Sequence, residues 1–515
     1  MNKSFTSTVA GASILITAVG LMGKSLGFVR EIVFANYFGL NTQYDLYLVG
    51  AVLPLTINTV IIYLAQNYFI PNYNKLKVEK PEEVKIFTNS IFWFFTFAGI
   101  ALSLILFYFS RIIVNFYLQP QTVNNLDAAL KVFRIFLITI PLNASFAVLA
   151  ASLQAEFEFK YPAYSQLLMN IAIIILVILL SGKVGVYTIP VGYVAGNLFQ
   201  LFFLLIKAGD KVTFNFRELF RRKGNLFLIN HSFIIIILIE SISQIYLLAD
   251  RYFFDSVQKG GIASLNYATN IFLLPVTIIS VALSTAIFPK FARFLNSNRK
   301  DELQSTLDNF YSINLFLFVP VSVVLFYYGD IIIRILFQRG EFNIGATMMT
   351  FEVLKYYALS LIFYSSYAVI NKLMYSANMV RSLLVITAAG CSIKVVLNFI
   401  LVGTFRQNGL AISTSISYLF FFLSASVLTA YKLRLHNYYF VKELLFNGAN
   451  ALFSFWISDI LISPSLTTSL LLNSFIRLIV FFSIYIINSV SSKHNSIKLF
   501  MDIFRYIRRK NIESA

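Results

Sequence analysis

Cysteine, histidine and charged residues are scarce in this 515-residue sequence, and the shortages exclude several kinds of site. The one cysteine, Cys391, excludes a disulfide framework and a Cys-rich metal site. The three histidines lie too far apart in the sequence to form a zinc signature. The sequence contains no P-loop motif that would predict ATP hydrolysis. It also contains no grouping of His, Asp or Glu that is typical of a transferase site. We therefore expect a protein that is not an enzyme and has no cofactor.

Charged residues make up 12% of the chain, against roughly 25% in soluble proteins. Hydrophobic residues make up 58%, and the mean hydropathy is +0.75. The first apolar run is followed by LGFVRE rather than by a small-residue cleavage pattern, so we expect a retained helix. The sequence predicts an all-α multi-pass membrane protein of about fourteen helices, because fourteen apolar runs approach the ~20 residues that span a bilayer. They are 8–28, 46–70, 87–110, 133–154, 162–181, 186–206, 227–249, 262–288, 310–328, 353–376, 383–403, 408–430, 444–462 and 468–490.

A formal net charge of +18 raises the question of nucleic acid binding, but the position of the charges indicates topology instead. If the N-terminus is cytoplasmic, most of the 41 lysines and arginines fall on cytoplasmic segments, as the positive-inside rule requires. We therefore predict that both termini are cytoplasmic, that anionic lipid head groups are partners and that nucleic acid is not. The richest segments are 75–85, 207–223, 290–300 and 505–510.

Self-similarity indicates that the chain contains two copies of a six-helix lobe. Three matches recur at nearly constant offsets of 221, 221 and 219 residues: Leu53-Pro54 with Leu274-Pro275, Ala147-Val148 with Ala368-Val369, and 111–119 with 330–338. An offset that spans six segments keeps both copies in the same orientation, so the repeat is parallel. We predict an N-lobe over 1–206, a cytoplasmic linker over 207–226, a C-lobe over 227–431, and two extra helices with a basic tail over 432–515.

Two prolines occupy equivalent places in the repeats. Pro54 and Pro275 each follow a leucine inside or at the end of an apolar run. Neighbouring helices can satisfy the carbonyl groups that a proline frees in a membrane helix. The pair therefore predicts matched bends in segments two and eight, which are either structural kinks or hinges for transport.

Charges cluster in and around the first hairpin, residues 22–54. Lys24 and Arg30 lie in or at the end of the first apolar run, and Asp45 begins the second. Intramembrane charges usually face a watery cavity and mark a substrate path. Six residues correspond to about 240° around a helix, so Arg30 joins Lys24 only if the helix end unwinds or Arg30 reaches round. Alternatively, Arg30 pairs with Glu31, and Asp45 orders the basic pair or caps the second segment.

The sequence resembles the MurJ/MviN-type flippases of the multidrug/oligosaccharidyl-lipid/polysaccharide exporter superfamily. The resemblance rests on LGFVREIVFANYFG with YDLYLV, on YATNIFLLPVTIISVALSTAIFPKFAR, on LFQRGEFNIGAT and on NGLAISTSISY, over about residues 20–430. It implies fourteen helices with two six-helix lobes in a V around a central cavity. It also implies a bacterial cytoplasmic (inner) membrane protein, functional as a monomer, that moves a polyprenyl-diphosphate-linked saccharide to the outer leaflet by alternating access.

The resemblance also suggests site residues. The family's basic positions fall on Lys24 and Arg30 and its acidic position on Asp45, while Arg251 joins these as a candidate substrate contact. Asn270 stands where the family has an arginine, and the family's arginine after Leu53-Pro54 has no counterpart. The cargo is therefore left open between the peptidoglycan precursor and an O-antigen or exopolysaccharide unit.

A second set of charges could couple transport to a gradient. Glu240 and Asp250 lie on segment seven, and Asp250 aligns with an acid that in some relatives helps to hold sodium. Lys394, deep in segment eleven, could place its ammonium where that cation would sit and pair with Asp250. Sodium, protons or the membrane potential are the candidate driving forces. In the extra helices, Arg477 and Asp459 either pair structurally or line a groove for the lipid tail.

Two other functions compete with a flippase. A cation-coupled multidrug exporter of the same superfamily would prefer an acidic cavity, whereas six embedded positions are basic: Lys24, Arg134, Lys355, Lys372, Lys394 and Arg477. A membrane glycosyl- or acyltransferase would need a convergent acid/base site, which the sequence does not suggest.

Overall fold

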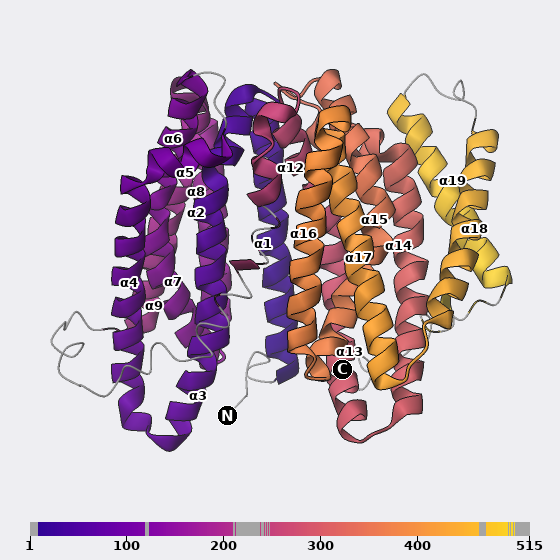
Figure 1. Cartoon of the computed structure of the whole chain (residues 1–515), viewed down its shortest axis with the longest axis horizontal. Helices are drawn as coiled ribbons and strands as arrows, with labels where there is room; N and C mark the ends of the chain where they lie inside the picture. The colour runs from indigo at the N-terminus through magenta and orange to yellow at the C-terminus, as the bar shows by residue number, and fades with distance from the viewer. Residues whose placement is uncertain are drawn as a thin grey trace. The chain divides into compact units, whose positions relative to one another are not determined.

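The computed structural model describes residues 9–118, 123–209, 248–462 and 470–492, together with 212, 237, 241, 242, 244, 246, 494, 496, 497 and 499. Side chains are left out at 9–21, 117, 123, 124, 281, 282, 284–286, 470 and 471. Every regular element in the described residues is a helix (Figure 1). The chain forms two compact units, one from the described residues of Met1–Ala263 and Arg339–Asn343, the other from those of Ser264–Gln338 and Ile344–Ala515.

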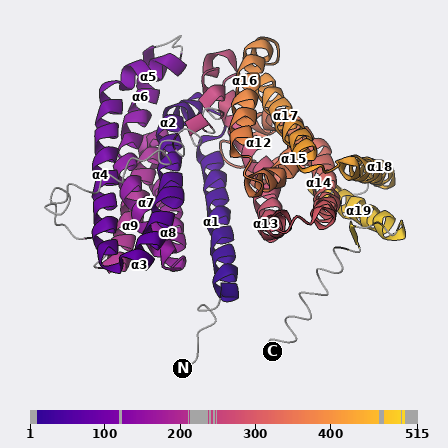
Figure 2. The same cartoon turned by 60° about the horizontal axis from the view of Figure 1, so that its bottom comes forward.

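The first unit is built on nine α-helices among its described residues. They are α1 (Val9–Phe38), α2 (Thr42–Leu64), α3 (Ile70–Glu79), α4 (Val84–Tyr108), α5 (Ser110–Tyr117), α6 (Val123–Leu137), α7 (Thr139–Ala155), α8 (Lys160–Val184) and α9 (Thr188–Ala208). Short 3-10 turns stand at Pro81–Glu83, Gly185–Tyr187 and Phe254–Ser256. In this unit α1 packs on α8, and α2 packs on α6 and α7 (Figures 1 and 2).

The second unit contains α13 (Val281–Asn296), α14 (Lys300–Phe337), α15 (Ile344–Ser376), α16 (Val380–Phe405), α17 (Gln407–Leu433), α18 (Tyr438–Leu461) and α19 (Leu470–Ser491). It also holds most of α12 (Gly261–Pro275), whose first turn belongs to the first unit. Here α15 packs on α14 and α17, α16 packs on α17, and α18 packs on both α14 and α19. The last two helices thus pack on each other and on α14, and their place outside the predicted duplication stays a prediction.

Small side chains make α7 the centre of the first unit. Its sequence ASFAVLAAS is buried almost throughout, and α4, α9 and α2 all pack against it. At Gly99 of α4, an added Cβ would lie 3.0 Å from the Cα of Pro141. Small residues let helix backbones approach closely where lipid supplies no hydrophobic driving force between helices. Aromatic residues complete this core, including Phe69 of the π-helical turn Ala65–Phe69 and Trp93 of α4.

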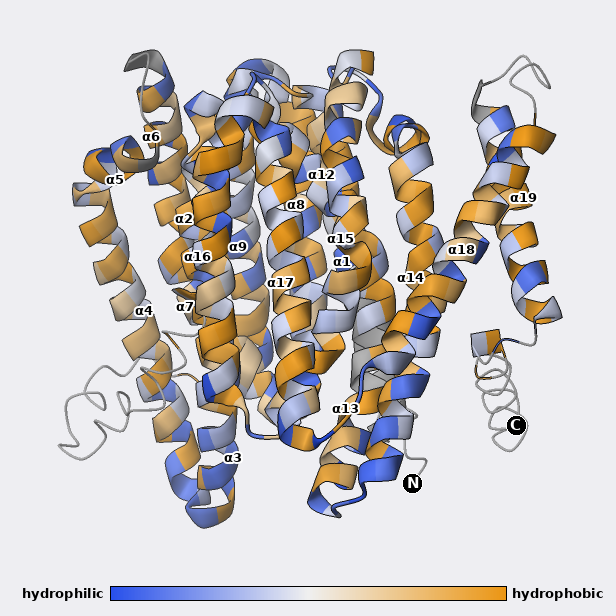
Figure 3. Cartoon of the chain, turned by 45° about the vertical axis from the view of Figure 1, so that its right-hand side comes forward, coloured by the Kyte–Doolittle hydropathy of each residue, from blue (hydrophilic) through white to orange (hydrophobic). Residues whose placement is uncertain are grey.

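The predicted spans agree with the described helices. Eleven stretches of the described residues are long and apolar enough to cross a membrane, and one of them, Lys160–Ala208, covers two predicted runs. The described part of predicted run 8–28 falls within α1, whereas run 227–249 lies mostly outside the described residues. Figure 3 shows apolar helix walls, with hydrophilic residues gathered near α3 and at the end of α13. The all-α multi-pass fold class is confirmed.

The two equivalent prolines stand beside different irregularities. Pro54 lies inside α2, which stays helical up to a π-helical turn at Ala65–Phe69. Pro275 is the last residue of α12, and a π-helical turn at Val276–Ser280 follows at once. The π-helical turn therefore begins eleven residues after Pro54 but directly after Pro275. Such turns often mark functional sites, and the hinge role of both prolines stays a prediction.

Two glycines let the end of α1 pack closely against residues 339–343 within the first unit. Glu341 N donates to the Asn36 carbonyl at 3.0 Å. Gly39 and Gly340 both have φ of +52°, and a Cβ on either would clash with the backbone of the other segment. Glycine reaches this left-handed region without steric cost, so both the turn and the close approach require it. The NYFG and QRGEF stretches noted in the sequence are therefore packed against each other.

Gly340→Ala should lower the free energy of unfolding by at least about 1 kcal/mol, because the new Cβ meets both a positive φ and the Asn36 carbonyl. Equilibrium unfolding in mixed micelles measures the change. Gly448→Ala is the matched control, because nothing lies within 4 Å of its Cβ position in α18. We expect the control to be neutral or slightly stabilising, and equal losses for both variants would contradict the close approach.

Candidate functional site

Arg30 anchors α1 to two neighbouring helices of the first unit. Its Nη2 lies 2.8 Å from Glu31 Oε1, and Nη1 donates to Asn170 Oδ1 of α8 at 3.1 Å. Its guanidinium carbon also lies 5.3 Å from the ring centre of Tyr193 on α9. The predicted alternative that Arg30 pairs with Glu31 is therefore confirmed. A planar guanidinium suits this arrangement, because it can stack on an aromatic ring while its edge donates hydrogen bonds.

Aromatic residues of α1, α2 and α6 pack on one side of the cluster that Arg30 forms with Glu31, Asn170 and Tyr193. Phe34, on the next turn of α1, stands edge-on to Tyr44 and Tyr47 of α2, with ring centres 6.4 and 6.3 Å apart. Tyr47 approaches Phe136 of α6 at 6.1 Å. All four rings are at most 3% exposed. The rings thus shield one side of the Arg30–Glu31 ion pair from water. The attraction between the two charges is stronger there than in water.

Lys24 lies in a different environment from Arg30. α1 is helical without a break from Val9 to Phe38, so the unwinding that would bring the two together is absent from the described backbone. Lys24 is exposed, and it has no hydrogen-bond or ion-pair partner among the described residues. Of the two predicted phosphate ligands, Lys24 is therefore the one whose ammonium is open to a ligand.

Asp45 is buried and accepts hydrogen bonds from backbone groups at the start of α12. Its Oδ2 accepts a hydrogen bond from Gly260 N at 2.6 Å, and its Oδ1 accepts one from Ala263 N at 2.7 Å. Ala263 lies in the first turn of α12, whose N–H groups lack partners inside the helix. The expectation that Asp45 caps α2 is wrong, because Asn41 Oδ1 accepts from Tyr44 N at 2.7 Å and fills that position. Its substrate contact stays a prediction.

Some of the other predicted site residues belong to the first unit and some to the second. Arg251 lies within electrostatic range of Asp45 in the first unit. Lys394 is 1% exposed on α16 of the second unit, and Asn270 lies on α12. Asp250 belongs to the first unit, so its pairing with Lys394 stays a prediction. Glu240 lies outside the described residues.

The predicted pair in the extra helices is present. Arg477 of α19 lies 2.7 Å from Asp459 of α18 through Nη1, and its Nη2 donates to the Ile462 carbonyl at 2.7 Å. The Asp459 side chain is 53% exposed. A partly exposed pair of this kind contributes at most about 1 kcal/mol in water. The contact therefore joins the last turn of α18 to α19.

A buried polar seam along α18 was missed in the sequence. Its residues recur every three or four positions on one helix face and are at most 8% exposed: Glu443, Asn447, Asn450, Ser454 and Ser458. Asn447 Oδ1 accepts from Tyr485 of α19 at 2.8 Å, and Asn450 Nδ2 donates to Ser489 at 2.9 Å. The helical spacing was a usable signal, because polar residues on one face of a membrane helix hydrogen-bond to neighbouring helices.

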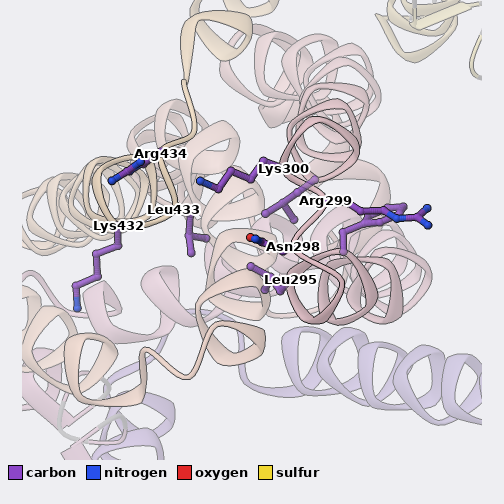
Figure 4. Close-up of a pocket in the computed structure, with 9 residues that line it drawn as sticks. Leu295, Asn298, Arg299, Lys300, Lys432, Leu433 and Arg434 are labelled. Carbon is purple, nitrogen blue, oxygen red and sulfur yellow. The ribbon is translucent and has the colours of Figure 1, made fainter.

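A basic pocket lies where three helix ends of the second unit meet. It has a volume of about 220 Å³ and is bounded by the turns after α13 and α17 (Figure 4). Lys300 extends towards the α17 turn, whereas Arg299 points away and pairs with Glu302 at 3.8 Å. Lys432 also lines a neighbouring cavity of about 650 Å³. No carboxylate lines the smaller pocket, so its charge suits an anion. No group of three His, Cys, Asp or Glu side chains that could hold a metal occurs in the described residues.

Comparisons with known proteins agree with this architecture. The sequence model of a family described as "Lipid II flippase MurJ" matches residues 34–482. A "Probable lipid II flippase MurJ" of Borreliella burgdorferi is 26% identical over 431 residues, which are 81% of this chain and 82% of that protein. The "Lipid II flippase MurJ" of Thermosipho africanus is 25% identical over 407 residues, 79% of this chain and 82% of the relative.

Solved structures show the same fold. A structure titled "Lipid II flippase MurJ, inward closed conformation" superposes with a TM-score of 0.80 at 24% identity, covering 93% of this chain and 99% of the other. An inward-facing multidrug resistance transporter of the MATE family, in the MOP superfamily, gives 0.67 at 12% identity, over 82% of this chain and 98% of that one. The fold is thus shared by solved structures whose titles name different functions.

Proposed function

Because this chain belongs to the family of lipid II flippases described as MurJ, we propose that it carries a polyprenyl-diphosphate-linked saccharide across a bacterial cytoplasmic membrane. The observation that carries the proposal is the family match over residues 34–482, which includes nearly all the described helices. Transport proceeds from the cytoplasmic to the outer leaflet by alternating access. The peptidoglycan precursor lipid II is the preferred cargo, since the relatives are named for it.

The chemistry of such a cargo sets what the chain must provide. A diphosphate carries about two negative charges, and moving an unpaired charge into hydrocarbon costs many kcal/mol. A carrier therefore needs at least one cation that is reachable from water inside a membrane helix. Lys24 fits this need, because it is exposed, lies inside α1 and has no partner among the described residues. We assign it the diphosphate contact.

Arg30 has a positioning role in this proposal. Two of its nitrogens are committed to Glu31 and Asn170, and its face lies over Tyr193. These contacts hold α1 against α8 and α9, so they fix the helix that presents Lys24. Arg251 and Asn270 remain candidate cargo contacts, and Glu240, Asp250 and Lys394 remain candidates for coupling to sodium, protons or the membrane potential. Pro54 and Pro275 remain candidate hinges.

The basic pocket of the second unit offers a binding place for the anionic lipids expected as partners. Lys300, Lys432 and Arg434 surround the basic pocket of the second unit, at turns on the side predicted to be cytoplasmic. Anionic head groups attract such clusters with about 1 kcal/mol per basic residue near the surface. We propose that these residues hold the second unit against the inner leaflet, and that the chain works as a monomer.

A cation-coupled multidrug exporter is the second candidate, and the MATE fold is the observation that favours it. Exporters of organic cations need unpaired carboxylates in reach of the drug. The buried acids Asp45 and Glu31 instead accept backbone or guanidinium hydrogen bonds in the first unit. At 12% identity the likeness covers the fold alone, so the family match decides in favour of a flippase.

Reconstitution tests the proposal directly. The purified full-length chain is placed in liposomes that contain fluorescent lipid II, and a membrane-impermeant reagent reports the cargo that reaches the opposite leaflet. We expect faster exposure than in protein-free liposomes, and equal rates would overturn the proposal. Parallel liposomes with a polyprenyl diphosphate bearing another glycan identify the preferred saccharide. Uptake of an organic cation, in place of lipid movement, would favour the exporter.

A further inference from the structure

Three glutamines of the first unit line one cavity, which we call the glutamine pocket. Gln66 belongs to the π-helical turn after α2, Gln154 to the last turn of α7, and Gln166 to α8. The pocket between them has a volume of about 230 Å³. None of the three side chains makes a hydrogen bond or ion pair with the described residues. Their amide groups are therefore open to a ligand.

The lining of the glutamine pocket suits an uncharged polar group. None of the described residues that line it is charged. Each glutamine amide has two N–H donors and a carbonyl acceptor. The hydroxyl groups of a sugar also donate and accept, so they match this lining better than a phosphate or an ammonium does. Ala147, Ala151 and Phe159 add apolar surface for the C–H faces of the ring. The volume is below the roughly 300–1,000 Å³ of sites for drug-sized ligands, so it suits a single ring.

The glutamine pocket adjoins the part of α1 that carries Lys24. A Cβ added to Gly23 would lie 3.7 Å from Gln166 Oε1, and α1 packs on α8. One turn further along α8, Asn170 accepts the hydrogen bond from Arg30. The same face of α8 thus supplies a wall of the pocket and a partner for the arginine that positions α1. The pocket therefore lies beside the helical turn that holds the assigned diphosphate contact.

We propose that the glutamine pocket binds the sugar next to the diphosphate of the lipid-linked cargo, an inference that rests on the proposed function. In such a cargo the saccharide is joined directly to the diphosphate, so the carrier must hold a charged group and a neutral ring side by side. Lys24 supplies the cation, and the three glutamines supply neutral hydrogen bonds. The pocket lies where α7 ends and α8 begins, on the side predicted to be cytoplasmic, from which the cargo is loaded. The glutamines therefore select a lipid that carries a glycan over a bare polyprenyl diphosphate.

Equilibrium binding in mixed micelles tests the pocket separately from transport. The full-length chain is titrated with fluorescent lipid II and, in parallel, with the same polyprenyl diphosphate without its glycan. The wild-type chain should bind lipid II more tightly. Gln66→Leu, Gln154→Leu and Gln166→Leu should each weaken lipid II binding by about two- to tenfold, as expected for the loss of a neutral hydrogen bond. Binding of the bare diphosphate should stay at the wild-type level, which also shows that each variant is folded. If the wild-type chain binds both lipids equally, or binds neither, the inference is overturned.

Two further variants make the test specific. Gln43, in the first turn of α2, is exposed, lies outside the pocket and has no hydrogen-bond partner in the part of the chain that the structure describes. Gln43→Leu should therefore bind both lipids as the wild-type chain does, whereas Lys24→Ala should weaken the binding of both, because both carry the diphosphate. Leucine variants of the pocket that bind lipid II as tightly as Gln43→Leu would contradict the site. Glycan-selective binding that the pocket variants lose supports the site even if liposomes show no lipid movement, a result that would refute only the proposed transport.

Discussion

Lys24→Ala should reduce lipid II exposure in the liposome assay to below about a tenth of the wild-type rate, while the protein still inserts and folds. A hydrogen bond to a charged group contributes about 1.5–3 kcal/mol, and about 1.4 kcal/mol corresponds to a factor of ten. Lys24 makes no hydrogen bond or ion pair with the described residues, so its removal costs the protein little stability. The expected defect is therefore in transport alone.

The control for Lys24 is another exposed lysine of the same unit. Lys183 lies in the last turn of α8 and also has no hydrogen-bond or ion-pair partner among the described residues. Lys183→Ala should transport at the wild-type rate, whereas Lys24→Arg should keep much of it, because arginine also binds phosphate. Full transport by Lys24→Ala would remove the diphosphate assignment. Since Lys24 precedes the matched residues 34–482, this variant tests the site independently of the family match.

The fold was predictable because its determinants are local. A membrane helix requires about 20 consecutive apolar residues, and that signal is present in each segment by itself. The sequence therefore gives the number of spans before any tertiary contact is known. The Arg477–Asp459 pair was also within reach, because the two residues lie 18 positions apart on consecutive helices. Neighbouring antiparallel helices bring such residues to the same level.

Partners far apart in the sequence could not be predicted. The carboxylate of Asp45 binds backbone groups 215 and 218 residues away, and a backbone N–H leaves no mark on the sequence. Arg30 was ambiguous for a related reason, since Asn170 is 140 residues distant and only packing of α1 on α8 brings it near. One helix face predicts the polar seam of α18 but not its partners Tyr485 and Ser489 on α19.

Asp45→Ala should lower the free energy of unfolding by about 3 kcal/mol or more. The substitution removes a carboxylate that accepts from both Gly260 N and Ala263 N, and both donors then lie buried without that partner. Each lost bond to a charged group is worth about 1.5–3 kcal/mol. Arg251 also loses the nearby charge. Equilibrium unfolding in mixed micelles measures the difference, and Asp127→Ala, at an exposed position of α6, should stay within about 0.5 kcal/mol.

Asp45→Asn separates the structural role of Asp45 from its predicted substrate role. The amide keeps one acceptor oxygen but turns an NH2 group towards the second backbone donor, so about half of the stability should be lost. If Asp45 serves the start of α12, transport by the folded fraction of either variant stays close to the wild-type rate. If Asp45 contacts the cargo, the transport rate of Asp45→Asn falls by more than its loss of folded protein explains. The ratio of transport rate to folded protein therefore decides between the two roles of Asp45.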